Sequence, residues 1–165
     1  MLISIRTSPR ETPSDEPADF LLACHARLRH FSATAIALAT RSDLDEEQID
    51  DACDELVRYF RVALPLHEAD EEVTLAPSLE PLVAAADVLE KMRRQHVVIH
   101  ETLDVLLPLW EAREQRASEP AARRLAALLD EHLALEESEL FPCIARLSSP
   151  ERKRLFFEMR GRRAF

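Results

Sequence analysis

Residues 67–77 read HEADEEVTLAP and residues 132–142 read HLALEESELFP, so one unusual phrase occurs twice in the chain. Both copies fit the pattern H-x-x-x-E-E-x-x-L-x-P, in which a histidine precedes a glutamate by four residues. On an α-helix this spacing places the imidazole and the carboxylate on one face, about one turn apart. The repeat therefore predicts two helices that each present an imidazole and a carboxylate on a single face.

Two further histidines, His25 and His96, precede the two copies at similar distances. Four long stretches around these residues carry an apolar stripe at about 3.5-residue spacing and are predicted to be helices. The predicted helices are residues 18–40, 45–76, 84–116 (or from residue 82) and 118–147. Histidines and acidic residues interrupt the stripes, namely His25, His67, Asp70 or Glu71, His96, His132, Glu136 and Glu139. Because the stripes face a core, these side chains are predicted to point into a helical bundle.

The composition supports an all-α fold of one domain. The chain has 165 residues, of which 47% are hydrophobic, enough for a single sizeable core. Glycine occurs once and aromatic residues make up 5%, whereas sheets favour β-branched and aromatic residues. We expect an irregular N-terminal arm over residues 1–17, a four-helix bundle over residues 18–147, and a short helix with a basic tail over residues 148–165.

Charge and hydropathy exclude two classes of partner. The net charge of −10 disfavours a general nucleic-acid binder, which needs basic surface to neutralise phosphates. No apolar run approaches the roughly 20 residues needed to span a bilayer, so no membrane partner is expected. The three cysteines are widely spaced and form no C-x-x-C pair, which favours reduced thiols in a cytoplasmic protein.

Buried glutamates in such a bundle require a counter-charge. An ionised carboxylate in an apolar core costs several kcal/mol unless it is paired. No arginine or lysine lies on the inner stripes near Glu71 or Glu136. A single core histidine can be an ordinary hydrogen-bonded residue, but four on matching stripes indicate ligands. A pair of divalent cations held by imidazoles and carboxylates would neutralise the site.

The ligand spacing distinguishes this site from other di-metal bundles. Ferritin-like sites use Glu-x-x-His on two helices and a lone glutamate on each of the others. This chain has His-x-x-x-Glu on two helices and a lone histidine on each of the others. The predicted site is therefore richer in nitrogen and poorer in carboxylate.

With these motifs, the chain resembles the hemerythrin-like proteins of the HHE cation-binding family over about residues 18–163. The matching stretches are residues 23–25, 59–60, 65–67, 70–72, 95–96, 132–142 and 159–163. The resemblance implies an up-down, hemerythrin-like four-helix bundle that contains a non-haem di-iron centre. It also implies two iron ions joined by an oxo or hydroxo bridge.

The resemblance further implies a role for each site residue. The terminal ligands would be His25, His67, His96 and His132, and Glu71 and Glu136 would bridge the ions. His100 follows His96 by four residues, like the H-x-x-x-H pair of oxygen-carrying hemerythrins, and is included as a metal ligand, with an outer or groove-lining role as the alternative. Glu68 is a further candidate because the iron-sensing hemerythrin domain of an F-box ubiquitin ligase has a glutamate ligand there. Glu137 would match the spacing of the oxygen carriers, although Glu136 fits the repeat better.

Pro65 lies two residues before His67, within the second predicted helix. A proline inside a helix removes one backbone hydrogen bond, so a kink is predicted at this point. The kink would either aim His67 at the cations or be a tolerated bend.

The function implied by the resemblance is binding or sensing of a small diatomic ligand (O2 or NO), or of iron itself. A nitrogen-rich centre favours binding over catalysis. The alternatives are an iron-dependent regulatory or interaction module, a di-iron enzyme that acts on peroxide or in iron–sulphur repair, and a zinc-filled structural bundle, because affinity alone does not select iron.

Overall fold

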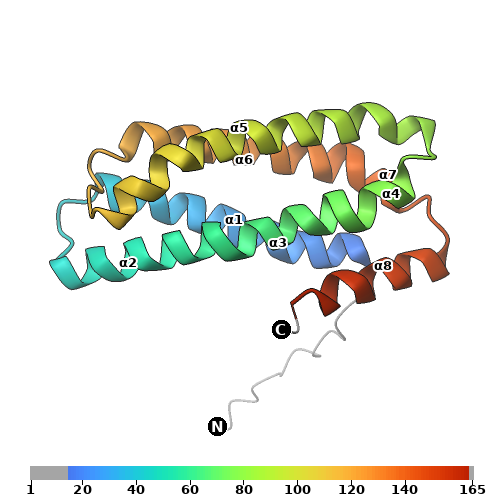
Figure 1. The fold of residues 1–165 in the computed structure, drawn as a ribbon, viewed down its shortest axis with the longest axis horizontal. Helices are drawn as coiled ribbons and strands as arrows, with labels where there is room; N and C mark the ends of the chain where they lie inside the picture. The colour runs from blue at the N-terminus through green and yellow to red at the C-terminus, as the bar shows by residue number, and fades with distance from the viewer. Residues whose placement is uncertain (1–14, 164–165) are drawn as a thin grey trace, which may run out of the picture.

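The computed structural model describes residues 15–163, and Figure 1 shows that their long helices lie side by side in an antiparallel bundle. The α-helices are α1 (Pro17–Thr40), α2 (Glu46–Arg58), α3 (Leu64–Ala69), α4 (Ala76–Leu79), α5 (Ala86–Glu111), α6 (Glu119–Leu135), α7 (Phe141–Ile144) and α8 (Ser149–Gly161). The π-helical segments are η1 (Tyr59–Ala63), η2 (Asp70–Leu75) and η4 (Glu136–Leu140), and η3 (Val83–Ala85) is a 3-10 turn.

Four rods make up the bundle: α1, the continuous run α2–α4, α5, and the continuous run α6–α7. No strand occurs within residues 15–163, so the predicted all-α fold is confirmed. The short fifth helix is present as α8, which packs against α1 and η2. Most of the irregular arm expected for residues 1–17 lies outside the described residues. No helix among residues 15–163 is long and apolar enough to cross a membrane.

Two apolar clusters occupy the two ends of the bundle. One contains Phe60 and Trp110, whose rings stack with centroids 5.7 Å apart, and the other contains Met92 and Leu140. On each rod a histidine lies between residues of one cluster and residues of the other, as His25 lies between Leu21 and Leu28 on α1. The polar side chains therefore form a layer that apolar packing separates from water at both ends.

Two helix starts follow the expected capping chemistry. The Asp45 carboxylate accepts a hydrogen bond from the Gln48 amide at 2.8 Å, and the Gln48 side chain accepts one from the Asp45 amide. Ser148 and Glu151 form the same reciprocal pair at the start of α8. Each pair satisfies backbone N–H groups that the first helical turn leaves without partners.

The predicted helix over residues 84–116 ends earlier, at Glu111. Arg113 has a φ of 59°, in the left-handed region, which an α-helix cannot continue through. Its guanidinium donates to Asp50 and Asp54 at 2.7 Å each, and also to the Trp110 carbonyl. These contacts to α2 stabilise a turn for which the sequence has no glycine or proline signal.

The chain around Pro65 widens into a π-helix. The η1 segment ends two residues before this proline, and the Leu64 amide donates a hydrogen bond to the Tyr59 carbonyl, five residues back. A π-turn is one of the adjustments that accommodate an interrupted hydrogen-bond ladder. The same adjustment recurs at η2 and η4, where both copies of the repeat pass from α-helix to π-helix.

The end of α8 is attached to the bundle through Asp70, a fully buried residue at the start of η2. Arg162 Nε lies 3.1 Å from Asp70 Oδ1, and Arg163 Nη1 contacts Asp70 Oδ2. Arg162 also donates to Thr74 Oγ1 at 2.7 Å. The Arg163 guanidinium lies over the Phe20 ring. Two arginines thus compensate a buried carboxylate that directly precedes Glu71.

Candidate metal centre

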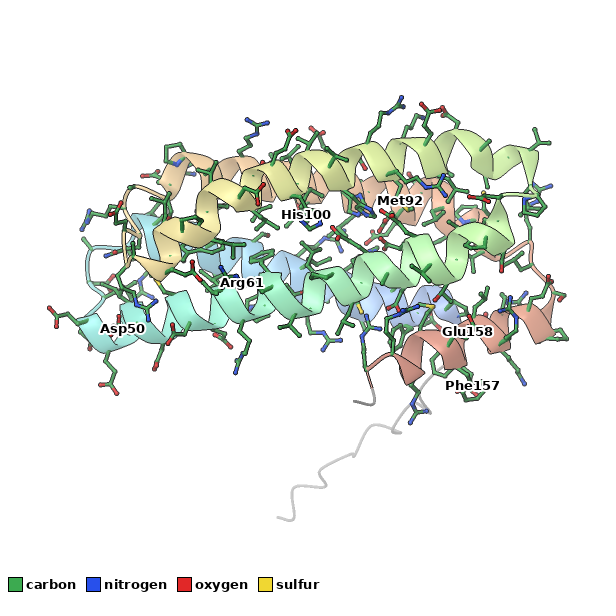
Figure 2. The ribbon with its side chains drawn as sticks, in the orientation of Figure 1. Asp50, Arg61, Met92, His100, Phe157 and Glu158 are labelled. Atoms are coloured by element: carbon green, nitrogen blue, oxygen red, sulfur yellow. The ribbon has the colours of Figure 1, made fainter. Side chains whose placement is uncertain are left out.

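Six of the predicted side chains converge in the polar layer between the two apolar clusters. In Figure 2, Met92 and His100 mark the part of α5 that carries His96. Every one of the six is buried. They come from all four rods: His25 (α1), His67 (α3), Glu71 (η2), His96 (α5), His132 (α6) and Glu136 (η4).

Each carboxylate oxygen of the two glutamates faces one imidazole Nε2 atom. The oxygens of Glu71 lie 3.0 Å from His67 Nε2 and 3.2 Å from His96 Nε2. The oxygens of Glu136 lie 3.0 Å from the Nε2 of His25 and 3.1 Å from that of His132. Four nitrogens and four oxygens therefore point at one another in the middle of the bundle.

These donor atoms form two adjoining groups, each able to surround one cation. One group consists of His25, His67, Glu71 and Glu136, and the other of Glu71, His96, His132 and Glu136. Within each group the ligand atoms lie within 4.8 Å of one another. Both glutamates belong to both groups, whereas each histidine belongs to one.

The converging atoms lack hydrogen-bond partners. Among the described residues, none of the four Nε2 atoms and none of the four glutamate oxygens makes a hydrogen bond. A buried polar atom without a partner costs about 1–3 kcal/mol, and a charged one more. Imidazole nitrogens and carboxylate oxygens are ligands for iron, zinc and manganese. The residues present therefore fit a pair of divalent cations.

Acceptors behind the histidines hold three of the four rings in the orientation that metal binding requires. The Nδ1 atoms of His25 and His96 lie 2.8 Å from Glu137 Oε1 and 2.5 Å from Glu72 Oε1, respectively. The Nδ1 atom of His132 lies 3.0 Å from a side-chain oxygen of Gln95. An acceptor at Nδ1 keeps the ring proton there and leaves the Nε2 lone pair facing inward.

The outer acceptors explain why the repeat contains two consecutive glutamates. Glu72 and Glu137 occupy the same place in the two copies, and each supports a lone histidine of a neighbouring rod. The sequence pattern indicated Glu137 only as an alternative ligand, and it indicated no role for Glu72 or Gln95. The repeated second glutamate was the signal that could have identified the first two as a pair.

The structure does not bring His100 or Glu68 into the two groups. His100 Nε2 lies 2.7 Å from Glu68 Oε2, and the His100 side chain is 48% exposed. Both residues line a groove of about 720 Å³ between α3 and α5, which Glu72 and His96 also border. His100 therefore has the groove-lining position that the sequence left as the alternative to ligation.

The charges of the centre stabilise one another strongly. Burial acts to raise the pKa of Glu71, but the charge of His67, whose Nε2 lies 3.0 Å from Glu71 Oε1, brings that pKa well below the usual value. Burial acts to lower the pKa of His67, yet the Glu71 charge raises it well above 6.5. For His96 the opposing effects of burial and Glu71 leave a pKa of about 9. Protons therefore compete with cations for the Nε2 atoms.

We expect cation binding to strengthen as the pH rises. Below a pH of about 9, a cation must displace the proton that His96 holds. The raised pKa of His67 adds to this competition in the same direction. Each displaced proton makes the affinity change about tenfold per pH unit. Titration with Zn²⁺ at pH 6, 7 and 8 should show the dissociation constant falling at least about tenfold per unit. An affinity that does not change over this range would contradict the expectation.

Comparison with known proteins agrees with this geometry. The sequence model of the hemerythrin HHE cation-binding domain matches residues 16–144, which include all six converging residues. An uncharacterized protein of Haemophilus influenzae is 26% identical over 131 residues, which cover 74% of this chain and 76% of that protein. Because the family match covers most of its length, the chain belongs to the hemerythrin HHE cation-binding domain family.

Proposed function

We propose that the protein holds two iron ions in this centre and binds or senses a small diatomic ligand, O2 or NO. The observation that carries the proposal is the pair of donor groups that share Glu71 and Glu136. Each group offers two imidazoles and two shared carboxylates, a donor set from which iron retains open coordination positions. Iron bound there would supply those positions together with reversible redox chemistry.

The residues around the centre favour capture of a ligand over its chemical conversion. The apolar clusters at both ends exclude bulk water, and the outer acceptors hold the ring protons of three histidines on Nδ1. On one side the Phe141 ring stacks on His25 with centroids 5.4 Å apart. A site with almost fully buried ligands, three of whose imidazoles are held by outer acceptors, admits a small gas more readily than a larger substrate.

A second candidate function is an iron-dependent interaction module. Asp70, which binds Arg162 and Arg163 at the end of α8, directly precedes Glu71 in η2. Any rearrangement of Glu71 on loss of a cation would therefore act on a helix at the surface of the bundle. In that case iron occupancy, with or without a gas, would be the signal.

Protein purified in air should contain about two irons per chain and absorb in the near-ultraviolet and visible range. Addition of azide to the oxidised protein, or of NO to the reduced protein, should change this spectrum, because both ligands occupy open coordination positions. Metal analysis and absorption spectroscopy measure the two effects on one sample. A protein without metal, or one whose spectrum neither ligand alters, would contradict gas binding, and rapid consumption of peroxide would indicate catalysis instead.

A further inference from the structure

The outer carboxylates behind His25 and His96 differ in how far their charge is neutralised. Among residues 15–163, no lysine or arginine pairs with Glu72, the acceptor of His96. Arg93 borders the same groove as Glu72, but its guanidinium donates to Glu80 at 2.7 Å. The ion held by His96 and His132 therefore has one outer carboxylate whose full negative charge faces an imidazole.

The outer carboxylate on the side of His25 is shared with an arginine. Glu137 Oε1 lies 2.8 Å from His25 Nδ1, and Arg29 Nη2 donates to the same oxygen at 2.9 Å. Arg29 follows His25 by four residues on α1, so both side chains lie on one face of that helix and reach Glu137 of η4 together. The guanidinium is always charged, so it offsets the charge that Glu137 presents to His25.

The oxygen that Arg29 uses distinguishes this contact from an ordinary surface ion pair. Exposed pairs contribute little to stability, and the Arg29 and Glu137 side chains are 42% and 32% exposed. With a cation at Nε2, however, the ring proton of His25 stays on Nδ1 and needs Glu137 Oε1 as its acceptor. Two donors thus share one acceptor atom, and the guanidinium weakens the bond to the imidazole.

We infer that Arg29 is a positioning residue that acts through Glu137 on His25 and makes the two ions unequal. Acceptors behind metal-bound imidazoles orient the rings and raise their basicity. Arg29 reduces that effect at His25, and His67, in the same donor group, has no hydrogen-bond partner at Nδ1 in the described part of the chain. The ion of this pair is therefore bound more weakly than the ion held by the other two histidines. The inference rests on the proposed binding of two cations.

Titration of the metal-free protein with Co²⁺, followed by its visible absorption bands, tests this inequality. The unaltered protein should bind two ions in two distinguishable steps. Arg29→Gln frees Glu137 for His25 and should tighten the second, weaker step about 3- to 10-fold, less than the 10- to 100-fold change that loss of an outer partner causes. The first step should stay unchanged. Arg29→Lys keeps the charge and the donor and should behave like the unaltered protein.

Arg27→Gln is the matched control. Arg27 is also an exposed arginine of α1, two residues from His25, but its guanidinium contacts the sulfur of Cys24 at 3.9 Å rather than an outer acceptor. This variant removes the same charge and should tighten the second step less than Arg29→Gln does. Equal tightening by the two variants, or no change in Arg29→Gln, would overturn the inference while leaving the proposed function in place. Failure of the unaltered protein to bind Co²⁺ would instead overturn the proposed function.

A double-mutant cycle shows whether the effect of Arg29 passes through Glu137. Glu137→Gln keeps an acceptor for His25 without its charge, and in this background Arg29→Gln should no longer tighten the second step. Tightening that persists in the Glu137→Gln background would overturn the inference.

A spectroscopic measurement reports on the His25 hydrogen bond itself. In Zn²⁺-loaded protein labelled with 15N-histidine, the NMR signal of the His25 Nδ1 hydrogen should move downfield in Arg29→Gln, because a stronger hydrogen bond deshields the proton. The signal should stay in place in Arg27→Gln. A His25 signal that does not move in Arg29→Gln would show that Arg29 does not act on this ring.

Discussion

Replacement of Glu71 and Glu136 together by glutamine should abolish binding of both cations. Both carboxylates belong to both donor groups, so the double variant leaves each group with two imidazoles and no negative charge. His25→Ala, in contrast, removes a ligand from one group alone and should leave one cation per chain. Metal analysis after dialysis against iron, with circular dichroism to confirm folding, measures the two stoichiometries.

Glu139→Gln is the control for these variants. Glu139 lies three residues after Glu136 on the same rod, but its side chain is 47% exposed and contacts Lys91 at the surface. This variant should retain both cations. The assignment of bridging carboxylates would be wrong if the double variant still bound two ions, or if Glu139→Gln lost them as completely.

Removal of the cations with a chelator should lower the melting temperature by roughly 10 °C. A ligand present at 1,000 times its dissociation constant stabilises the folded state by about 4 kcal/mol. For a domain of this size, each kcal/mol shifts the melting temperature by about 2–4 °C. The physical origin is the pair of buried carboxylates, whose charge the imidazoles alone would have to compensate.

Thermal unfolding followed by circular dichroism, with and without chelator, measures this shift. The double glutamine variant is the control, because a protein that cannot bind the cations should melt at the same temperature in both conditions. Identical melting curves for the unaltered protein would mean that the cations do not stabilise the fold. That result would also remove the basis for an iron-dependent interaction module.

The inward-facing part of the site was predictable from the sequence, because helical periodicity determines which face of a helix a residue occupies. The spacing of His67 and Glu71, repeated in His132 and Glu136, was sufficient to place four of the six converging side chains. Helix type was not predictable in the same way. The same spacing crosses an α-to-π junction in both copies, and the apolar periodicity does not mark it, although each π-helical segment ends two residues before a proline, Pro77 or Pro142.

Side-chain contacts between different rods of the bundle could not be predicted from the helical periodicity of the sequence. Glu72 and Gln95 each support a histidine on another rod, so their roles depend on how the rods are rotated against each other. His100 shows the same limit. It lies on the same face as His96, one turn further along, but at that level the neighbouring rod presents Glu68 and an open groove. The spacing along one helix indicates which face a side chain occupies, but it does not indicate whether the neighbouring helix buries that side chain.

The division of the histidines between the two donor groups is relevant to how the chain could have evolved. His25 and His67 come from the first two rods, and His96 and His132 from the last two, so each helical hairpin supplies both imidazoles of one ion. Among the six ligands, only the carboxylates of Glu71 and Glu136 contribute to the ion of the other hairpin as well as to that of their own. This is the pattern expected if a single ancestral hairpin first paired with its own copy around shared ions, and a gene duplication later fused the two into one polypeptide.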